Sequence, residues 1–243
     1  MAGTTAAATA QTPPVRALIF DMDGTMIDSM PHHRQSWIAF AAHHGLTVGV
    51  DDLMRRTTGR TGAECMGELF GRALGHEEAW ALVRHKERLY REAFGPCFAE
   101  IRGFRDFYAR AGARGLRLGV GTAGDADNIA FALGHLKLPE HPAAIVGGDQ
   151  GLPGKPEPHI FLEVARRLGV APEHCVVFED APLGVEAARR AGMPAVALTT
   201  TMPPEAFTGF PNVIGIHADL TAIDLDRLAH EVARFRDPRP TAA

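Results

Sequence analysis

The stretch VRALIFDMDGT, residues 15–25, decides the fold of this chain. Its first six residues, 15–20, are mostly apolar and predict a buried β-strand. The strand runs straight into Asp21 and Asp23, two carboxylates two residues apart. Like charges this close are costly without a cation between them, and carboxylate oxygens suit Mg²⁺ in particular. Gly24 allows the backbone to turn immediately afterwards, so the stretch predicts a strand that ends in a metal-binding loop.

The same pattern of apolar run, polar loop and helical stretch recurs along the chain. Further strands are predicted at 116–121, 144–146, 175–178 and 195–198. Helical periodicity follows three of the loops, at 125–134, 158–168 and 182–191. Strands alternating with helices predict an α/β fold with a doubly wound parallel sheet. The functional site of such a sheet lies in the loops after its strands.

Residues 30–99 break the alternation, because they show helical periodicity and no convincing strand. We interpret them as a small all-α domain inserted after the first strand of an α/β core made of residues 15–29 and 100–236. The ends of the chain, 1–14 and 237–243, are small, polar and proline-containing, and they are predicted to be disordered tails.

Composition excludes several classes of protein. The 243 residues have a hydrophobic share of 46% and contain no apolar run long enough to cross a bilayer. A formal net charge of −4 gives no basic field for nucleic acid or an anionic membrane. The three cysteines are odd in number, form no CxxC motif and follow no secretory leader, so we expect small buried side chains in a cytoplasmic protein. No exposed apolar helix face stands out, and a monomer is expected.

Later loops carry groups that complement the two aspartates. Thr122 follows the second strand, and its hydroxyl and the backbone N–H groups around Ala123 could hold phosphate oxygens. Lys155 lies in a stiff Gly-Lys-Pro loop and could balance the charge of a nucleophile and a phosphate. Glu179 and Asp180 end the fourth strand as a second carboxylate pair for a metal ion.

In this order, the DMDGT loop, Thr122, Lys155 and the Glu179–Asp180 pair resemble the four motifs of the haloacid dehalogenase superfamily. The stretch FEDAPLGVEAARRAG, 178–192, is similar to the branch that contains β-phosphoglucomutase and small sugar phosphatases. In that branch the insertion after the first motif is a helical cap, which is what 30–99 looks like.

The resemblance implies roles for the core residues. Asp21 would attack phosphorus and form an aspartyl-phosphate, while Asp23 would protonate the leaving oxygen and then activate water. Mg²⁺ would be held by Asp21, the backbone carbonyl of Asp23, and Asp180. Glu179 is either a further metal ligand or a group that orients the ligands, and the sequence does not rank these two roles.

The resemblance also implies a set of substrate-binding residues. In the core these are Gly24, Thr122, Ala123 and Lys155, around the phosphoryl group. In the cap, the candidates are His33, Gly59, Arg60, Thr61 and Lys86. Simpler interpretations stay open for the cap: residues 59–61 could be a plain turn between helices, and His33 and Lys86 could lie on an exposed face.

Within this branch the sequence favours a phosphatase acting on a small phosphorylated metabolite such as a sugar or polyol phosphate. A β-phosphoglucomutase is the alternative. Thr25 stands where these mutases usually carry Val, and Gly62 stands where they usually present an arginine to a second phosphate, although Arg60 could reach in from a neighbouring position. The segment GVGTAG, 119–124, formally satisfies GxGxxG, so a dinucleotide-binding oxidoreductase is a distant alternative. That motif belongs to the first strand of its fold, whereas 119–124 follows the second.

Overall fold

The computed structural model describes residues 15–236, so both predicted tails, 1–14 and 237–243, lie outside the described residues. Six strands form one sheet in the order β3-β2-β1-β4-β5-β6, and every neighbouring pair is parallel. The strands are β1 Ala17–Phe20, β2 Arg117–Gly121, β3 Ala144–Val146, β4 Cys175–Glu179, β5 Ala195–Leu198 and β6 Val213–His217. The predicted doubly wound parallel sheet is confirmed.

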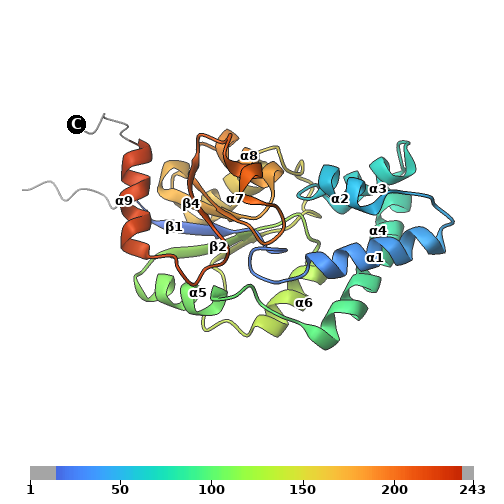
Figure 1. Ribbon diagram of the computed structural model, residues 1–243, viewed down its shortest axis with the longest axis horizontal. Helices are drawn as coiled ribbons and strands as arrows, with labels where there is room; N and C mark the ends of the chain where they lie inside the picture. The colour runs from blue at the N-terminus through green and yellow to red at the C-terminus, as the bar shows by residue number, and fades with distance from the viewer. Residues whose placement is uncertain (1–14, 237–243) are drawn as a thin grey trace, which may run out of the picture.

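Helices cover both faces of the sheet (Figure 1). One face packs against α5 Phe104–Ala113, α6 Ala126–Leu136 and α9 Leu225–Arg236, and the other against α7 His159–Leu168 and α8 Pro182–Arg190. Strand β1 contributes side chains to the core on both faces of the sheet, because successive side chains of a strand point to opposite faces. Leu18 and Phe20 join the first core cluster, and Ala17 and Ile19 join the second. With both faces buried, β1 reads as a continuous apolar run.

The sequence analysis missed β6 as well as helices α5 and α9. Strand β6 pairs only with β5 at the edge of the sheet, and its residues are largely half-buried. An edge strand of sequence VIGIH lacks the unbroken apolar run that marked the buried strands. Helices α5 and α9 both have an apolar stripe against the first core cluster.

The insertion consists of four helices with a core of their own. They are α1 Met30–His43, α2 Val50–Thr57, α3 Gly62–Phe70 and α4 His76–Phe94, and a short 3-10 turn, η1 Gly95–Cys97, follows them. Trp37 and Phe40 of α1 pack with Leu53 and Met66 and with Val83 of α4. Figure 1 shows these helices at one end of the sheet, away from α9.

The two connections between the insertion and the sheet lie side by side. Ile27 forms an isolated antiparallel bridge with Glu100, and the N–H of Asp28 donates to the carbonyl of Ala99 at 2.9 Å. The N–H of Ile101 donates to the carbonyl of Met26 at 3.0 Å. The chain therefore enters and leaves the insertion through one narrow, hydrogen-bonded pair of segments.

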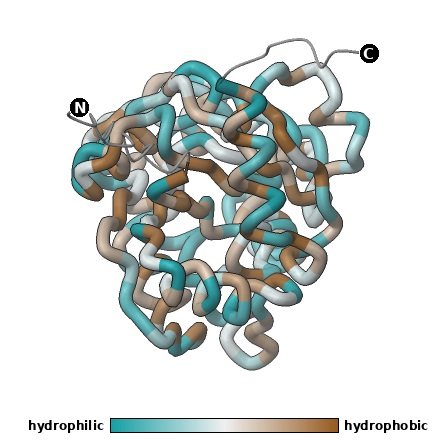
Figure 2. Tube along the Cα trace, turned by 90° about the vertical axis from the view of Figure 1, so that its left-hand side faces the viewer, coloured by the Kyte–Doolittle hydropathy of each residue, from teal (hydrophilic) through white to brown (hydrophobic). Residues whose placement is uncertain are grey.

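None of the helices between residues 15 and 236 combines the length and the apolar character that crossing a bilayer requires. Figure 2 agrees, because hydrophobic stretches along the trace are short and are interrupted by hydrophilic ones. The cysteines correct one expectation. Cys65 and Cys175 are buried as expected, whereas Cys97 is exposed just after α4.

Candidate active site

The parallel sheet brings the predicted core residues together. Asp21 follows β1, Thr122 follows β2, and Glu179 and Asp180 lie at the end of β4. Strand β1 lies between β2 and β4, with Phe20 opposite Val120 on one side and opposite Phe178 on the other. The three loops therefore leave the same edge of the sheet at the same level. The strand order also reverses at β1, which is where ligands bind in such sheets.

Asp21, Glu179 and Asp180 form a compact acidic cluster. One carboxylate oxygen from each lies within 4.8 Å of the others, and all three side chains are buried. Burial raises the pKa of Asp21 well above its usual value, although Lys155 opposes this effect. Burial and the charge of Glu179 raise the pKa of Asp180 to about 8. Burial makes the ionised form of both carboxyl groups costly, and three carboxyl groups face the single ammonium group of Lys155, which is an environment that a bound cation would stabilise.

Hydrogen bonds distinguish the oxygens that are free to bind a cation from those that are not. Asp180 Oδ1 accepts a hydrogen bond from the Thr25 hydroxyl at 3.2 Å, but Oδ2 is buried without a partner within residues 15–236. Both oxygens of Glu179 are engaged: Oε1 accepts from Lys155, and Oε2 accepts from the N–H groups of Asp180 and Ala181 at 3.0 and 2.9 Å. The donor set fits Mg²⁺, with Asp180 rather than Glu179 offering a free oxygen.

Lys155 joins two members of the acidic cluster, Asp21 and Glu179. Lys155 is only 1% exposed. Its ammonium group donates to Asp21 Oδ1, and it donates to Glu179 Oε1 at 2.6 Å. Burial alone would lower the pKa of Lys155, but the two carboxylates outweigh burial and raise it. Lys155 is thus a fixed positive charge beside Asp21, as the sequence analysis expected.

Gly24 and Thr122 complete the core side of the site. Gly24 has φ 78°, a backbone conformation that favours glycine, and a Cβ at this position would collide with the Asp180 carboxyl group. Both the conformation and the available space therefore require glycine here. The Thr122 hydroxyl accepts from the N–H of Gly124 at 3.0 Å and has its own proton left to donate. Helix α6 starts one turn later and is already capped by the Asp125 carboxylate, which accepts from the N–H of Asn128. An anion at this loop would therefore meet Thr122 and the backbone at Ala123 rather than the N-terminus of α6.

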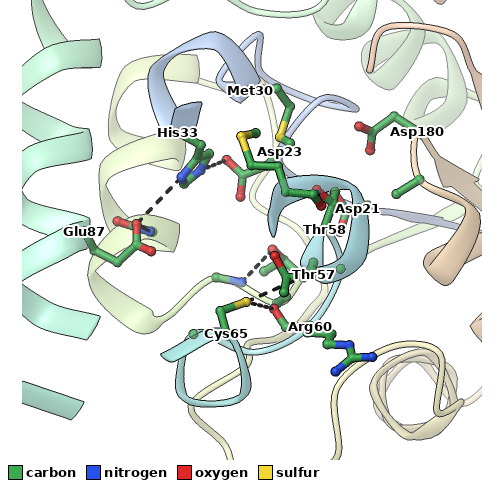
Figure 3. A pocket seen from close by; sticks show the side chains of 18 of the residues that line it. Asp21, Asp23, Met30, His33, Thr57, Thr58, Arg60, Cys65, Glu87 and Asp180 are labelled. Atoms are coloured by element: carbon green, nitrogen blue, oxygen red, sulfur yellow. Dashed lines mark hydrogen bonds and ion pairs between the residues drawn. The ribbon is translucent and has the colours of Figure 1, made fainter. Parts of the chain in front are cut away.

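Asp23 is held by Ser29, which directly precedes α1, and by His33 and Tyr90 of the insertion; Figure 3 shows the contact with His33. Its Oδ1 accepts from the Ser29 hydroxyl at 2.7 Å, from His33 Nε2 at 3.0 Å and from the Tyr90 hydroxyl at 3.4 Å. Burial alone would raise the pKa of Asp23, but His33, Ser29 and Lys86 together lower it. Asp23 is therefore a carboxylate near neutral pH when the pocket holds no ligand.

The protonation pattern of His33 follows from its neighbours. Lys86 Nζ lies 2.6 Å from His33 Nδ1, and because an ammonium group can only donate, Nδ1 accepts. In a neutral imidazole the proton is then on Nε2, which donates to Asp23. The His33 ring stacks on the Tyr90 ring, with 3.8 Å between the ring centroids. Lys86 Nζ also donates to Glu87 Oε1 at 3.0 Å. His33 and Lys86 lie beside the site, which excludes the interpretation that they belong to an exposed face.

One pocket lies between the edge of the sheet and the insertion, and Asp21, Asp23, Thr122, Ala123 and Asp180 line its core side. The sequence analysis missed many of its walls. These are Met30, Trp37, Met54, Thr57, Thr58, Cys65 and Glu87 from the insertion, and Gly124, Asn128 and Ala181 from the core. Figure 3 shows Met30 and Cys65 on the same pocket as the aspartates. Apolar pocket walls have the same helical spacing as core residues, so no sequence signal separated them.

The loop before α3 contributes less than predicted. Gly59 and Arg60 line the pocket, but in Figure 3 the Arg60 guanidinium points away from Asp21 and Asp23. Thr61 is not among the lining residues. Its hydroxyl accepts from the N–H of Glu64 and its own N–H donates to Glu64 Oε2 at 2.8 Å, a capping box that starts α3.

Comparison with known proteins places this architecture in a family. Residues 15–192 match the haloacid dehalogenase-like hydrolases, so the chain belongs to that family. It is 35% identical to fructose-1-phosphate phosphatase YqaB of Escherichia coli (strain K12) over 74% of this chain and 94% of that protein. It is 34% identical to a phosphorylated carbohydrates phosphatase of Thermotoga maritima over 74% and 82%. The β-phosphoglucomutase structure from Clostridium difficile has the same fold, with a TM-score of 0.79 and 20% identity over 91% of this chain and 99% of that one.

Proposed function

We propose that this phosphoric monoester hydrolase is a Mg²⁺-dependent phosphatase of sugar or polyol phosphates, and that it works through an aspartyl-phosphate on Asp21. The observation that carries the proposal is the joint placement of Asp21, Lys155 and Asp180 at the edge of the sheet, with Asp23 two residues from the nucleophile. The phosphatases of phosphorylated carbohydrates to which the chain is similar support the substrate class.

In the first step, an Asp21 oxygen attacks phosphorus and the bond from phosphorus to the leaving oxygen breaks. Lys155 and the Thr122 hydroxyl hold the phosphoryl oxygens, which spreads the charge that develops on them. Asp23 delivers a proton to the leaving oxygen. A negatively charged phosphate in the pocket opposes ionisation of Asp23 and so favours this acid form.

In the second step, water attacks the aspartyl-phosphate and releases inorganic phosphate and the free Asp21 carboxylate. Asp23, now a carboxylate, accepts the proton of the attacking water. The charge and hydrogen bond of His33 and the hydrogen bond of Ser29 lower the pKa of Asp23 against the effect of burial, which keeps Asp23 in the carboxylate form that this step needs. His33 and Lys86 act as positioning residues, because His33 touches Asp23 and Lys86 touches His33, and neither acts on the phosphorus itself.

A bound Mg²⁺ would be held by Asp21, Asp180 and the backbone carbonyl of Asp23, and would supply charge neutralisation between the carboxylate nucleophile and the phosphate. The free oxygen of Asp180 supports this ligand set. Glu179 fixes Lys155 and the turn after β4 instead of binding the ion directly.

We further propose that residues 30–99 are a cap domain on a core made of 15–29 and 100–236, because a separate small core and a single paired connection set the insertion apart. Residues Met30 and Cys65 would then meet the part of the substrate beyond its phosphate. Composition supports a cytoplasmic monomer that binds neither nucleic acid nor membranes.

The test is release of inorganic phosphate from a panel of hexose, pentose and polyol phosphates, with Mg²⁺ and with chelator. We expect metal-dependent release by the wild-type protein and loss of essentially all of it in Asp21→Asn. Asp226→Asn, at an exposed carboxylate paired with Arg114, is the matched control and should keep full activity. Phosphate release that persists in Asp21→Asn would refute the mechanism.

A second arm separates the phosphatase from the mutase. The protein is given β-glucose 1-phosphate primed with the 1,6-bisphosphate, and glucose 6-phosphate and free phosphate are both measured. A phosphatase releases phosphate and accumulates little glucose 6-phosphate. Glucose 6-phosphate that forms with little free phosphate would make the protein the mutase.

A further inference from the structure

Three histidines meet on the insertion, separate from the acidic cluster. His43 ends α1, His44 is its C-cap residue, and His85 lies in the middle of α4. One ring nitrogen from each lies within 4.8 Å of the others. We propose that His43, His44 and His85 bind one borderline divalent cation, represented by Zn²⁺, at a site distinct from the Mg²⁺ site.

The nitrogen spacing fits such an ion. His44 Nε2 and His85 Nδ1 are 3.3 Å apart and share a hydrogen bond, which a bound ion would replace with two coordinate bonds. Tetrahedral coordination with Zn–N bonds of about 2.0–2.1 Å places two ligand nitrogens about 3.3 Å from each other. The His43 and His85 rings meet edge to face, with their centroids 4.7 Å apart. Because His43 is exposed, its side chain can rotate and bring a ring nitrogen to the ion held by His44 and His85. Water would fill the fourth position.

The surroundings favour a cation and hold two of the rings in place. The C-terminus of a helix carries a partial negative charge, and α1 ends at His43. Phe40 is completely buried and packs against the site. The centroid of its ring is 4.4 Å from that of His44 and 5.4 Å from that of His85. The nearby Arg88 pairs with Glu92 at 3.8 Å, which offsets its positive charge.

The chemistry of the ligands separates this site from the one at the sheet edge. Imidazole nitrogens suit Zn²⁺, Ni²⁺ and Cu²⁺, whereas Mg²⁺ selects oxygen ligands. The ion would join the end of α1 to the middle of α4. These two helices also carry His33 and Lys86, which position Asp23, so the ion would stiffen the support of the acid/base residue without touching it.

The experiment is a calorimetric titration of Zn²⁺ into the full chain with the acidic site kept occupied by excess Mg²⁺. The wild-type protein is compared with His43→Gln and His85→Gln, and with His76→Gln as the matched control at the other end of α4. We expect one ion per chain with micromolar affinity in the wild type and in the control. We expect at least a tenfold loss of affinity in the other two variants.

Thermal unfolding gives an independent readout. At free Zn²⁺ about 100-fold above its Kd, binding to the folded state alone lowers the unfolding constant about 100-fold. The unfolding temperature should therefore rise in the wild type and in His76→Gln, and it should rise clearly less in His85→Gln, because a tenfold weaker site lowers the unfolding constant only about 11-fold at the same Zn²⁺ concentration. Equal Zn²⁺ affinity in all four proteins, or wild-type binding weaker than about 100 μM, would overturn the proposal. Neither result would affect the proposed phosphatase, whose test depends on Asp21.

Discussion

Gly184, in α8 and four residues after Asp180, should be essential although it has no side chain that could take part in the chemistry. A Cβ built at this position overlaps the carboxyl group of Glu179, and even the more distant Oε2 would be only 2.6 Å away. Glu179 has no free direction in which to move, because Lys155 and two backbone N–H groups hold its oxygens. Gly184→Ala therefore cannot be accommodated without breaking some of these hydrogen bonds.

The size of the effect follows from two opposing contributions. Alanine in place of glycine inside a helix stabilises by about 1 kcal/mol. Overpacking of a filled site costs about 1–3 kcal/mol, and losing a hydrogen bond to a charged group costs about 1.5–3 kcal/mol more. The net expectation for Gly184→Ala is a loss of about 1.5–5 kcal/mol of unfolding free energy. For a chain of this size that lowers the unfolding temperature by roughly 3–20 °C.

The same substitution at Gly134 is the matched control. Gly134 lies inside α6, and a Cβ there would meet nothing within 4 Å. Gly134→Ala should therefore raise the unfolding temperature by about 2–4 °C. Both variants are followed by circular dichroism on heating and by phosphate release. Gly184→Ala should also lose at least tenfold in kcat, since Lys155 would shift from Asp21. If Gly184→Ala unfolds at or above the wild-type temperature with unchanged kcat, Glu179 does not have the positioning role assigned to it.

Two further predictions concern the metal site and the acid/base residue. Asp180→Asn removes a buried carboxyl group whose ionised form burial and Glu179 disfavour, so in chelator it should unfold at or above the wild-type temperature, while millimolar Mg²⁺ should stabilise the wild type alone; stabilisation of both proteins by Mg²⁺ to the same degree would place the ion elsewhere. His33→Gln should lower kcat about tenfold or more and leave the Mg²⁺ concentration for half-maximal activity unchanged, because it disturbs only Asp23. His32→Gln, whose ring stacks on Phe94 instead, should keep the wild-type kcat, and an equal loss in both variants would show a general packing defect.

The core half of the site could be predicted from the sequence because strand ends carry positional information. Asp21, Thr122 and Asp180 each follow an apolar run, and parallel strands bring such ends to one edge. Lys155 follows no strand directly. It was found from its residue type in a stiff loop and from the family resemblance, and its hydrogen bonds to Asp21 and Glu179 give it the expected place.

The insertion half could not be predicted to the same depth. Trp37 in α1 and Cys65 in α3 each belong to the apolar stripe of their helix, and both contribute to the insertion's core and to the pocket wall. Helical periodicity alone does not distinguish these two roles. The support of Asp23 by Ser29 and Tyr90 was also missed, because two residues 61 positions apart in sequence carry no sign that they share a partner. The role of Glu179 became clear only from its hydrogen bonds, because the sequence Glu179-Asp180 fits a metal ligand and a residue that orients the ligands equally well.

Gly62 shows how the insertion bears on the choice between hydrolysis and mutase chemistry, which share one core. A Cβ at Gly62 would lie 2.9 Å from Val83 of α4, so an arginine there would require α3 to move away from α4. The Arg60 guanidinium points away from the aspartates, with Glu68 3.9 Å from it (Figure 3). Lys86 already donates to His33 and Glu87. Within the described insertion none of these three positions directs an unpaired positive group toward the aspartates, which supports the proposed phosphatase over the mutase.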